Sequence, residues 1–147
     1  MDKEYRQYIE NLAAYCRDVT FHGEYSQTFR FAPKRHPGDG DSNTVTKMTI
    51  SVDHVYLNQL ITVYPETTLA YKRKDYKQIG KDMLHEICHT YFQAVWDLFV
   101  WDQCQSQKKS NDETVERQVQ RVAVTIYSLL PRGWYLPSRL KKVGQSA

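Results

Sequence analysis

The spacing of apolar residues constrains the fold of this chain more than any other feature, because it changes from helical to strand-like and back to helical. Apolar residues at spacings of three and four from Lys3 to about Val19 predict an amphipathic N-terminal helix. Two later helical patterns run from about Tyr76 to about Trp101 and from about Asp112 to Leu130, where Pro131 stops the second. With strands between, this order predicts an α+β fold: an N-terminal helix, a small β-sheet and two further helices.

The region between the first two helical patterns is predicted to be β-rich. Phe21, Phe29 and Phe31 stand at strand-like spacing, ahead of an exposed loop over residues 37–43. Met48, Ile50 and Val52 alternate with polar residues as a half-buried strand does, and the run from Leu60 to Tyr64 predicts a second strand that Pro65 ends. Two strands therefore precede the long helix, which Asp75 can cap after a basic loop around residues 72–74.

Length and composition favour one compact domain over residues 1–147. The chain has 147 residues, 41% hydrophobic and 13% aromatic, which is enough to build a single core and argues against intrinsic disorder. No internal repeat or low-complexity tract suggests a second domain. Residues 131–147 are predicted to form a partly ordered tail, and residues 103–112 a polar connecting loop.

The sequence favours a cytoplasmic protein with reduced thiols. No stretch approaches the ~20 consecutive apolar residues that cross a bilayer, so no membrane association is expected. The N-terminus lacks the apolar segment of a signal peptide. Cys16, Cys88 and Cys104 are odd in number and widely spaced, which argues against a disulfide framework.

The charge pattern makes nucleic acid an unlikely partner. Net charge is +3, and basic residues are spread along the chain except for two short clusters, at residues 72–74 and 139–142. Nucleic-acid binding usually needs a denser basic stripe. Clusters of this length are ordinary at the ends of solvated helices.

A His-Glu-x-x-His run lies inside the long predicted helix. At about 100° per residue, His85 and His89 fall on one face, one turn apart, so both imidazoles can reach one ion at the ~2.0–2.1 Å that zinc requires. Glu86 points to one side of the pair. That position suits a general base acting on a water at the metal better than it suits a third ligand.

A catalytic zinc site needs a third protein ligand, and no histidine follows His89. The last predicted helix offers Glu113 and Glu116. On its helical wheel Glu116 borders the apolar stripe whereas Glu113 faces water, so Glu116 is the predicted ligand and Glu113 the alternative. Three aspartates are outside candidates: Asp97, Asp102 and Asp112.

The two motifs together resemble the small glutamate-zincin metallopeptidases of phages and bacteria, including the ImmA/IrrE family. The likeness covers roughly residues 61–131: the His85 to His89 run, a connecting loop, and Glu116 followed by Val119, Gln120 and Ala123 at the expected offsets. The family often has glycine where Cys88 stands, and Asn or Asp where Gln120 stands. The resemblance implies a zincin-like fold with two zinc helices beneath a sheet, and zinc held by His85, His89 and Glu116.

The resemblance also implies a function, the hydrolysis of peptide or protein substrates with zinc as cofactor and Glu86 as base. Substrate peptides in such enzymes pair with the edge strand of the sheet, for which residues 60–64 are the candidate. Tyr91 and Tyr127 are conceivable oxyanion-stabilising side chains, although packing explains both. The main alternative function is a non-catalytic zincin-fold module for binding or structure. The oligomeric state is not predicted.

Overall fold

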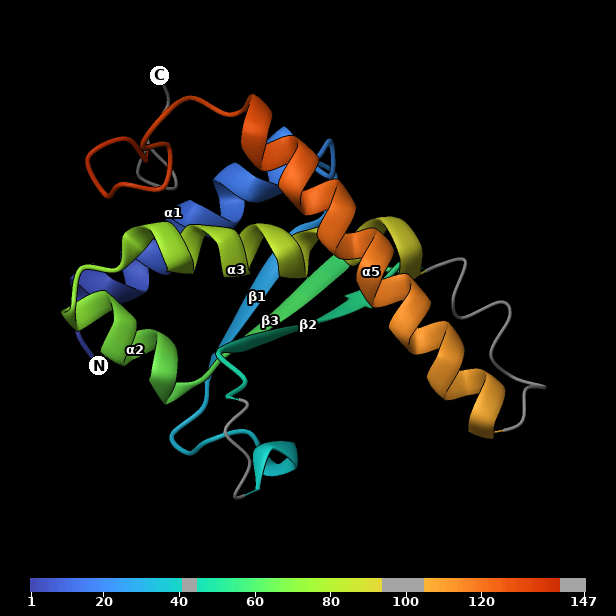
Figure 1. Ribbon diagram of the computed structural model, residues 1–147. Helices are drawn as coiled ribbons and strands as arrows, with labels where there is room; N and C mark the ends of the chain where they lie inside the picture. Colours follow the sequence, from blue (N-terminus) through green and yellow to red (C-terminus); the bar gives the residue numbers. More distant parts are fainter. Residues whose placement is uncertain (41–44, 94–104, 141–147) are drawn as a thin grey trace.

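The computed structural model describes residues 1–40, 45–93 and 105–140, with the side chains of 105–111 excepted, and it confirms the predicted α+β class (Figure 1). In chain order the elements are α1 (Lys3–Val19), β1 (Ser26–Phe31), the 3-10 turn η1 (Pro37–Asp39), β2 (Met48–Asp53), β3 (Asn58–Val63), α2 (Pro65–Lys72), α3 (Tyr76–Cys88) and α5 (Gln105–Leu129).

The three strands form one mixed sheet in the order β1-β3-β2. β1 pairs with β3 in parallel and β2 pairs with β3 in antiparallel fashion, so Phe29 and Ile50 flank Ile61 from the two sides. β3 therefore lies in the centre of the sheet, and the prediction that residues 60–64 form the edge is wrong. The edges are β1 and β2. Every second residue of β3 is buried, as a central strand beneath helices requires.

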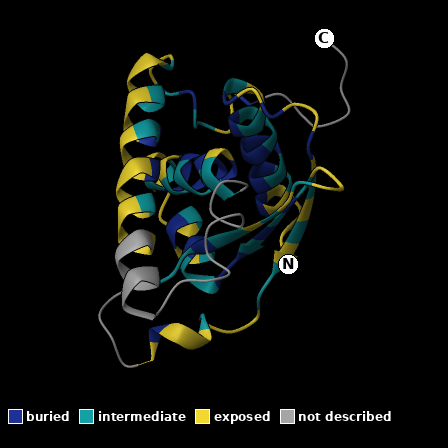
Figure 2. Cartoon of the chain, turned by 90° about the vertical axis from the view of Figure 1, so that its right-hand side faces the viewer, coloured by how far each residue is buried: buried dark blue, intermediate teal, exposed yellow. Residues whose placement is uncertain are grey.

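The core lies between the sheet and the helices that cover one of its faces. α1 and α3 pack against each other, and α3 also contacts β2 and α5 (Figure 1). Figure 2 shows buried residues where these helices face the sheet and exposed residues along much of α5. The fully buried apolar side chains include Ile9, Leu12, Ile61, Met83 and Ile87. This packing holds α3, with the His-Glu-x-x-His run near its end, between the sheet and α5.

α3 begins where the sequence predicts, with the Asp75 carboxylate accepting from the backbone N–H of Gln78. It ends sooner than predicted. Cys88 is its last residue and His89 is the C-cap, whose backbone N–H bonds to the carbonyl of Glu86. Residues 90–93 are helical again, and residues 94–101 of the predicted helix lie outside the described part of the chain.

Two further element boundaries differ from the prediction. Pro65 ends β3 but also opens α2, because proline at the first helical position loses no intrahelical hydrogen bond. The basic cluster at residues 72–74 therefore covers the end of a helix as well as a turn. α5 begins at Gln105, so most of the loop predicted over residues 103–112 is helical, and it ends at Leu129 just ahead of Pro131.

The segment after α5 returns to the core. Trp134 is buried and stacks on Tyr15 of α1, and Leu140 is buried too. The Tyr8 hydroxyl donates to the carbonyl of Tyr135 at 3.1 Å. Of the tail predicted over residues 131–147, Trp134 and Tyr135 thus contact α1 and lie beside Gly80 of α3. Residues 141–147 lie outside the described ranges. Among the described helices, none has the length and apolar character needed to cross a membrane.

Candidate metal centre

α3 and α5 bring His85, His89 and Glu116 together where the two helices pack. One ligand atom from each residue lies within 4.8 Å of the others. His85 Nε2 is 2.6 Å from Glu116 Oε1, and His89 Nε2 is 3.3 Å from Glu116 Oε2. One carboxylate thus faces both imidazole rings. A group of two histidines and a glutamate in this arrangement could hold a metal ion.

The position of Glu116 follows from how α5 docks. Val119 and Ala123 are buried and fix the side of α5 that faces α3. Glu116 precedes Val119 by three residues, so the two side chains are neighbours on the helix surface and Glu116 lies beside the buried face. Its side chain is 55% exposed, against 19% and 21% for His85 and His89. The carboxylate therefore reaches the histidines from the solvent side of the junction.

One separation between donor atoms of the cluster matches that of two ligands on a small divalent ion. Two ligands at ~2.0–2.1 Å from a tetrahedral zinc lie roughly 3.3–3.4 Å apart. The separation of His89 Nε2 from Glu116 Oε2, 3.3 Å, has this value. The shorter separation at His85 is a hydrogen bond, in which the ring nitrogen donates the proton that a metal would replace.

Gln120 supports His85 from the opposite ring nitrogen. His85 Nδ1 donates to Gln120 Oε1 at 2.8 Å, and Gln120 lies one turn after Glu116 on the same helix. A hydrogen bond at Nδ1 fixes the tautomer in which Nε2 faces the metal position. The amide of Gln120 therefore supports the His85 ring from the side away from Glu116.

Glu86 lies beside the cluster and lines the same cleft as His89 and Glu116. Burial raises the pKa of the Glu86 carboxyl to about 7, although the two neighbouring histidines favour its ionised form. A group with a pKa in this range can both take up and release a proton near neutral pH. A divalent cation bound beside it would favour the carboxylate.

Contacts within the cluster shift the pKa values of Glu116 and His85 in opposite directions. The hydrogen bonds from His85 and His89 hold the pKa of Glu116 far below its usual range, against the opposing effect of burial. For His85, burial alone would lower the pKa, but the hydrogen bond to Glu116 and the charges of Glu86 and Glu116 outweigh it and the pKa is raised. Both shifts favour the charged pair, an imidazolium at His85 beside a carboxylate at Glu116.

A cleft opens from the cluster toward β2. Thr49 and Ile50 of β2 line one side, and Phe92 and Val115 supply apolar walls. The remaining lining residues are Glu86, His89, Gln93, Asp112 and Glu116. β2, and not β3, is therefore the edge strand that the sheet presents to the cluster.

The other candidate residues are placed as follows. Glu113 is exposed and lines a recess that His85 and Glu116 also line, but it is not one of the three clustered residues. The Tyr91 hydroxyl donates to the carbonyl of Thr20, and the Tyr127 ring packs against Trp134 and beneath the Lys81 ammonium. Asp97 and Asp102 lie outside the described ranges. Of the cysteines, Cys16 and Cys88 are free and buried.

Sequence reasoning missed one contact near the site, the hydrogen bond of the buried Gln59 to Thr90, the residue after His89. A glutamine at an apolar position of a strand is the signal that could have found it.

Comparisons with protein-family models, with curated proteins and with solved structures gave no match to this chain.

Proposed function

We propose that this chain is a zinc-dependent peptidase with a zincin-like fold. The observation that carries the proposal is the convergence of His85, His89 and Glu116 on one point, with Glu86 beside them in the same cleft. Two imidazole nitrogens and one carboxylate form a donor set that zinc accepts in catalytic sites, where a fourth position stays open. The α+β arrangement and the resemblance of the two motifs support the same assignment.

The proposed reaction divides the chemistry between the metal and the chain. Zinc in such a site supplies a Lewis acid that lowers the pKa of a water molecule and polarises a carbonyl group. His85, His89 and Glu116 would hold it, and Gln120 keeps the His85 ring in the ligating tautomer. Glu86 takes the proton of the attacking water and returns it to the departing amine.

An extended peptide is the substrate that the cleft suits. Among the described strands, β2 is at an edge of the sheet and pairs only with β3, so its other side can accept a further strand. Thr49 and Ile50 of β2 line the cleft that holds Glu86. A peptide that adds to this edge would gain main-chain hydrogen bonds and pass beside the histidines. Phe92 and Val115 would offer apolar contact to one of its side chains.

The decisive experiment compares the wild type with Glu86→Gln, which keeps the shape of the side chain and removes the base. Both proteins should bind about one zinc per chain, because Glu86 is outside the ligand group. Cleavage of a broad peptide library should fall by at least ~10²-fold in the variant, as expected for loss of general-base catalysis. Glu113→Gln, an exposed neighbour on α5, is the matched control and should keep full activity.

Two results would count against the proposal. Equal cleavage by the wild type and Glu86→Gln would refute the role of Glu86. If zinc is bound but neither protein cleaves any peptide, the chain is a metal-binding module and not an enzyme.

A further inference from the structure

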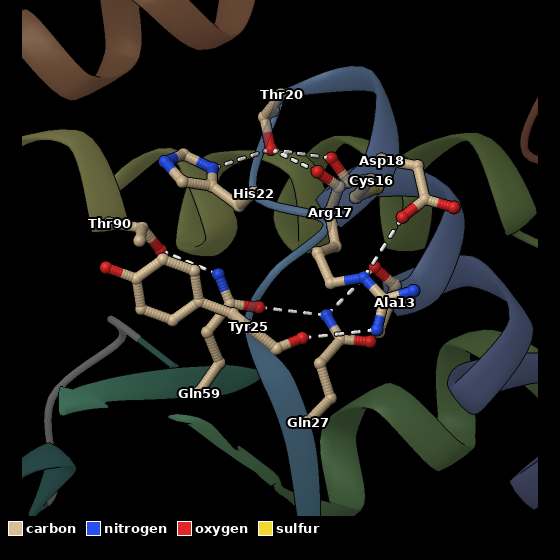
Figure 3. Close-up of polar contacts among 10 residues, drawn as sticks. All are labelled: Ala13, Cys16, Arg17, Asp18, Thr20, His22, Tyr25, Gln27, Gln59 and Thr90. Carbon is tan, nitrogen blue, oxygen red and sulfur yellow. Dashed lines mark hydrogen bonds and ion pairs between the residues drawn. The ribbon is translucent and has the colours of Figure 1, made fainter. Parts of the chain in front are cut away.

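A series of hydrogen bonds runs into the core and reaches the residue that follows His89 (Figure 3). Gln59, on the central strand β3, is 0% exposed, and its Nε2 donates to Thr90 Oγ1 at 2.9 Å. Gln59 Oε1 accepts from Gln27 Nε2 of β1 at 2.9 Å, and the same nitrogen donates to the Ala13 carbonyl of α1 at 3.0 Å. These hydrogen bonds thus link α1 to Thr90 through β1 and β3.

The direction of this series of hydrogen bonds is fixed at one end. The Ala13 carbonyl can only accept, so the amide nitrogen of Gln27 must face it. That nitrogen then meets the oxygen of Gln59, which leaves the Gln59 nitrogen to face Thr90. Neither amide can turn over without breaking its neighbour's bond. The hydroxyl of Thr90 is therefore held by a donor whose orientation is set from α1.

A glutamine is costly at the position of Gln59. It alternates with Ile61 and Val63 on the buried side of β3, where an apolar residue would need no hydrogen-bond partners. Fully satisfied polar networks of this kind fix one arrangement of the groups they join. The group joined here is Thr90, itself 3% exposed.

His89 depends on such support because the regular helix ends before it. As the C-cap of α3, its backbone N–H bonds to the carbonyl of Glu86, three residues back, and not to that of His85. The position of its ring therefore depends partly on the contacts of the two residues that follow, Thr90 and Tyr91. Thr90 is held by Gln59, and Tyr91 donates its hydroxyl to the carbonyl of Thr20 at the end of α1.

We propose that Gln59 is a positioning residue for the second histidine of the metal site and acts through Thr90. The inference rests on the proposed function, since it takes His89 as a metal ligand. Ligands must be held within a few tenths of an ångström for tight binding, and groups behind them commonly change metal affinity ~10–100-fold. Gln59 touches neither metal nor substrate, so its effect must appear in the geometry and affinity of the site.

The test uses three variants of the full chain and measures zinc affinity by competition with a chelator. Thr90→Val keeps the shape and removes the hydroxyl, Gln59→Met keeps the length and removes the amide, and Thr90→Ser keeps the hydroxyl. Thr90→Val and Gln59→Met should bind zinc roughly 10-fold more weakly, which is the smaller of the losses expected when a group behind a metal ligand is removed. Thr90→Ser should bind close to the wild type. The absorption spectrum of bound Co²⁺ should change in the first two variants only.

Val63→Ala is the matched control, because Val63 lies on the same buried side of β3 and takes no part in the hydrogen bonds that link Gln27, Gln59 and Thr90. It should lower resistance to denaturant but leave zinc affinity and the Co²⁺ spectrum unchanged. An equal loss of affinity in Val63→Ala, or none in Thr90→Val and Gln59→Met, would overturn the positioning role while the metal site stands. A wild type that binds no zinc would overturn both.

Discussion

Glu116 illustrates how much a single side chain depends on its place at the border of a buried surface. Val119 anchors its helix, and the carboxylate stays 55% exposed while it contacts both histidines. The helical wheel predicts this border position from the sequence. The distances to the two rings depend on how α5 crosses α3, which the pattern of apolar residues does not specify.

Replacing Glu116 with alanine should therefore weaken zinc binding by on the order of 10²-fold or more, since loss of a ligand exceeds the loss of an outer-shell partner. Glu113→Ala removes an equal charge one turn earlier and should have almost no effect, because Glu113 lies outside the ligand group. Zinc titration against a competing chelator measures both. The reverse order would show that Glu113 is the ligand.

At the scale of elements, the sequence predicts helices where the apolar pattern is regular and fails where the backbone depends on distant contacts. α1 matches its predicted range, from Lys3 to Val19. The central place of β3 is not predictable in this way, because the alternation along one strand shows which face is buried but not which strands pair with it. α2 is not predicted, because a proline after a strand-like run indicates the end of a strand as readily as the start of a helix.

The break at His89 and the start of α5 were missed for similar reasons. The apolar pattern of α3 continues past Cys88, but the helix ends there, so local periodicity gave no sign of the break. The first turns of α5 carry polar residues, which left no stripe to detect. Of the candidate site, the motif residues are predictable from the sequence. For Gln59 the sequence shows only a polar residue at an apolar position of a strand, and its partners are not predictable because they come from β1 and from the residue after His89.

The contact of α3 with the C-terminal segment gives a test of element packing. A Cβ added at Gly80 would lie 2.6 Å from Tyr135 Cβ and 3.3 Å from Trp134 Cη2. Alanine favours a helix by ~1 kcal/mol over glycine, but overpacking costs ~1–3 kcal/mol. Gly80→Ala should therefore lower the free energy of unfolding by about 1 kcal/mol, measured in urea.

Gly23→Ala is the control for that variant, since its Cβ would meet only Asp18 Oδ1, at 3.9 Å, and its backbone lies outside the left-handed region. It should leave stability unchanged or raise it by ~0.4–1 kcal/mol. A stabilised Gly80→Ala would mean that residues 134 and 135 do not pack on α3 as described.

For the whole molecule, the metal cluster makes stability depend on pH in two opposing ways. The pKa of Glu116 is lowered in the folded protein, so its contribution is present above the unfolded value of ~4.3 and is lost as pH falls through the folded value. The pKa of His85 is raised, so its contribution is full below the unfolded value of ~6.5 and is lost as pH rises through the folded value. Without metal, the cluster therefore stabilises the fold most between about pH 4.3 and 6.5.

Zinc should stabilise the fold at the higher pH values, where the metal-free cluster loses its contribution. It binds neutral imidazole and must displace the proton that lies between His85 and Glu116. The rise in melting temperature on adding zinc should thus be small near pH 5.5 and large near pH 7.5, on either side of the ordinary histidine pKa of ~6.5. Melting curves with zinc or with chelator, at both pH values, measure this. Glu116→Ala should show little zinc effect at either pH, whereas a wild-type effect equal at both would contradict histidine ligation.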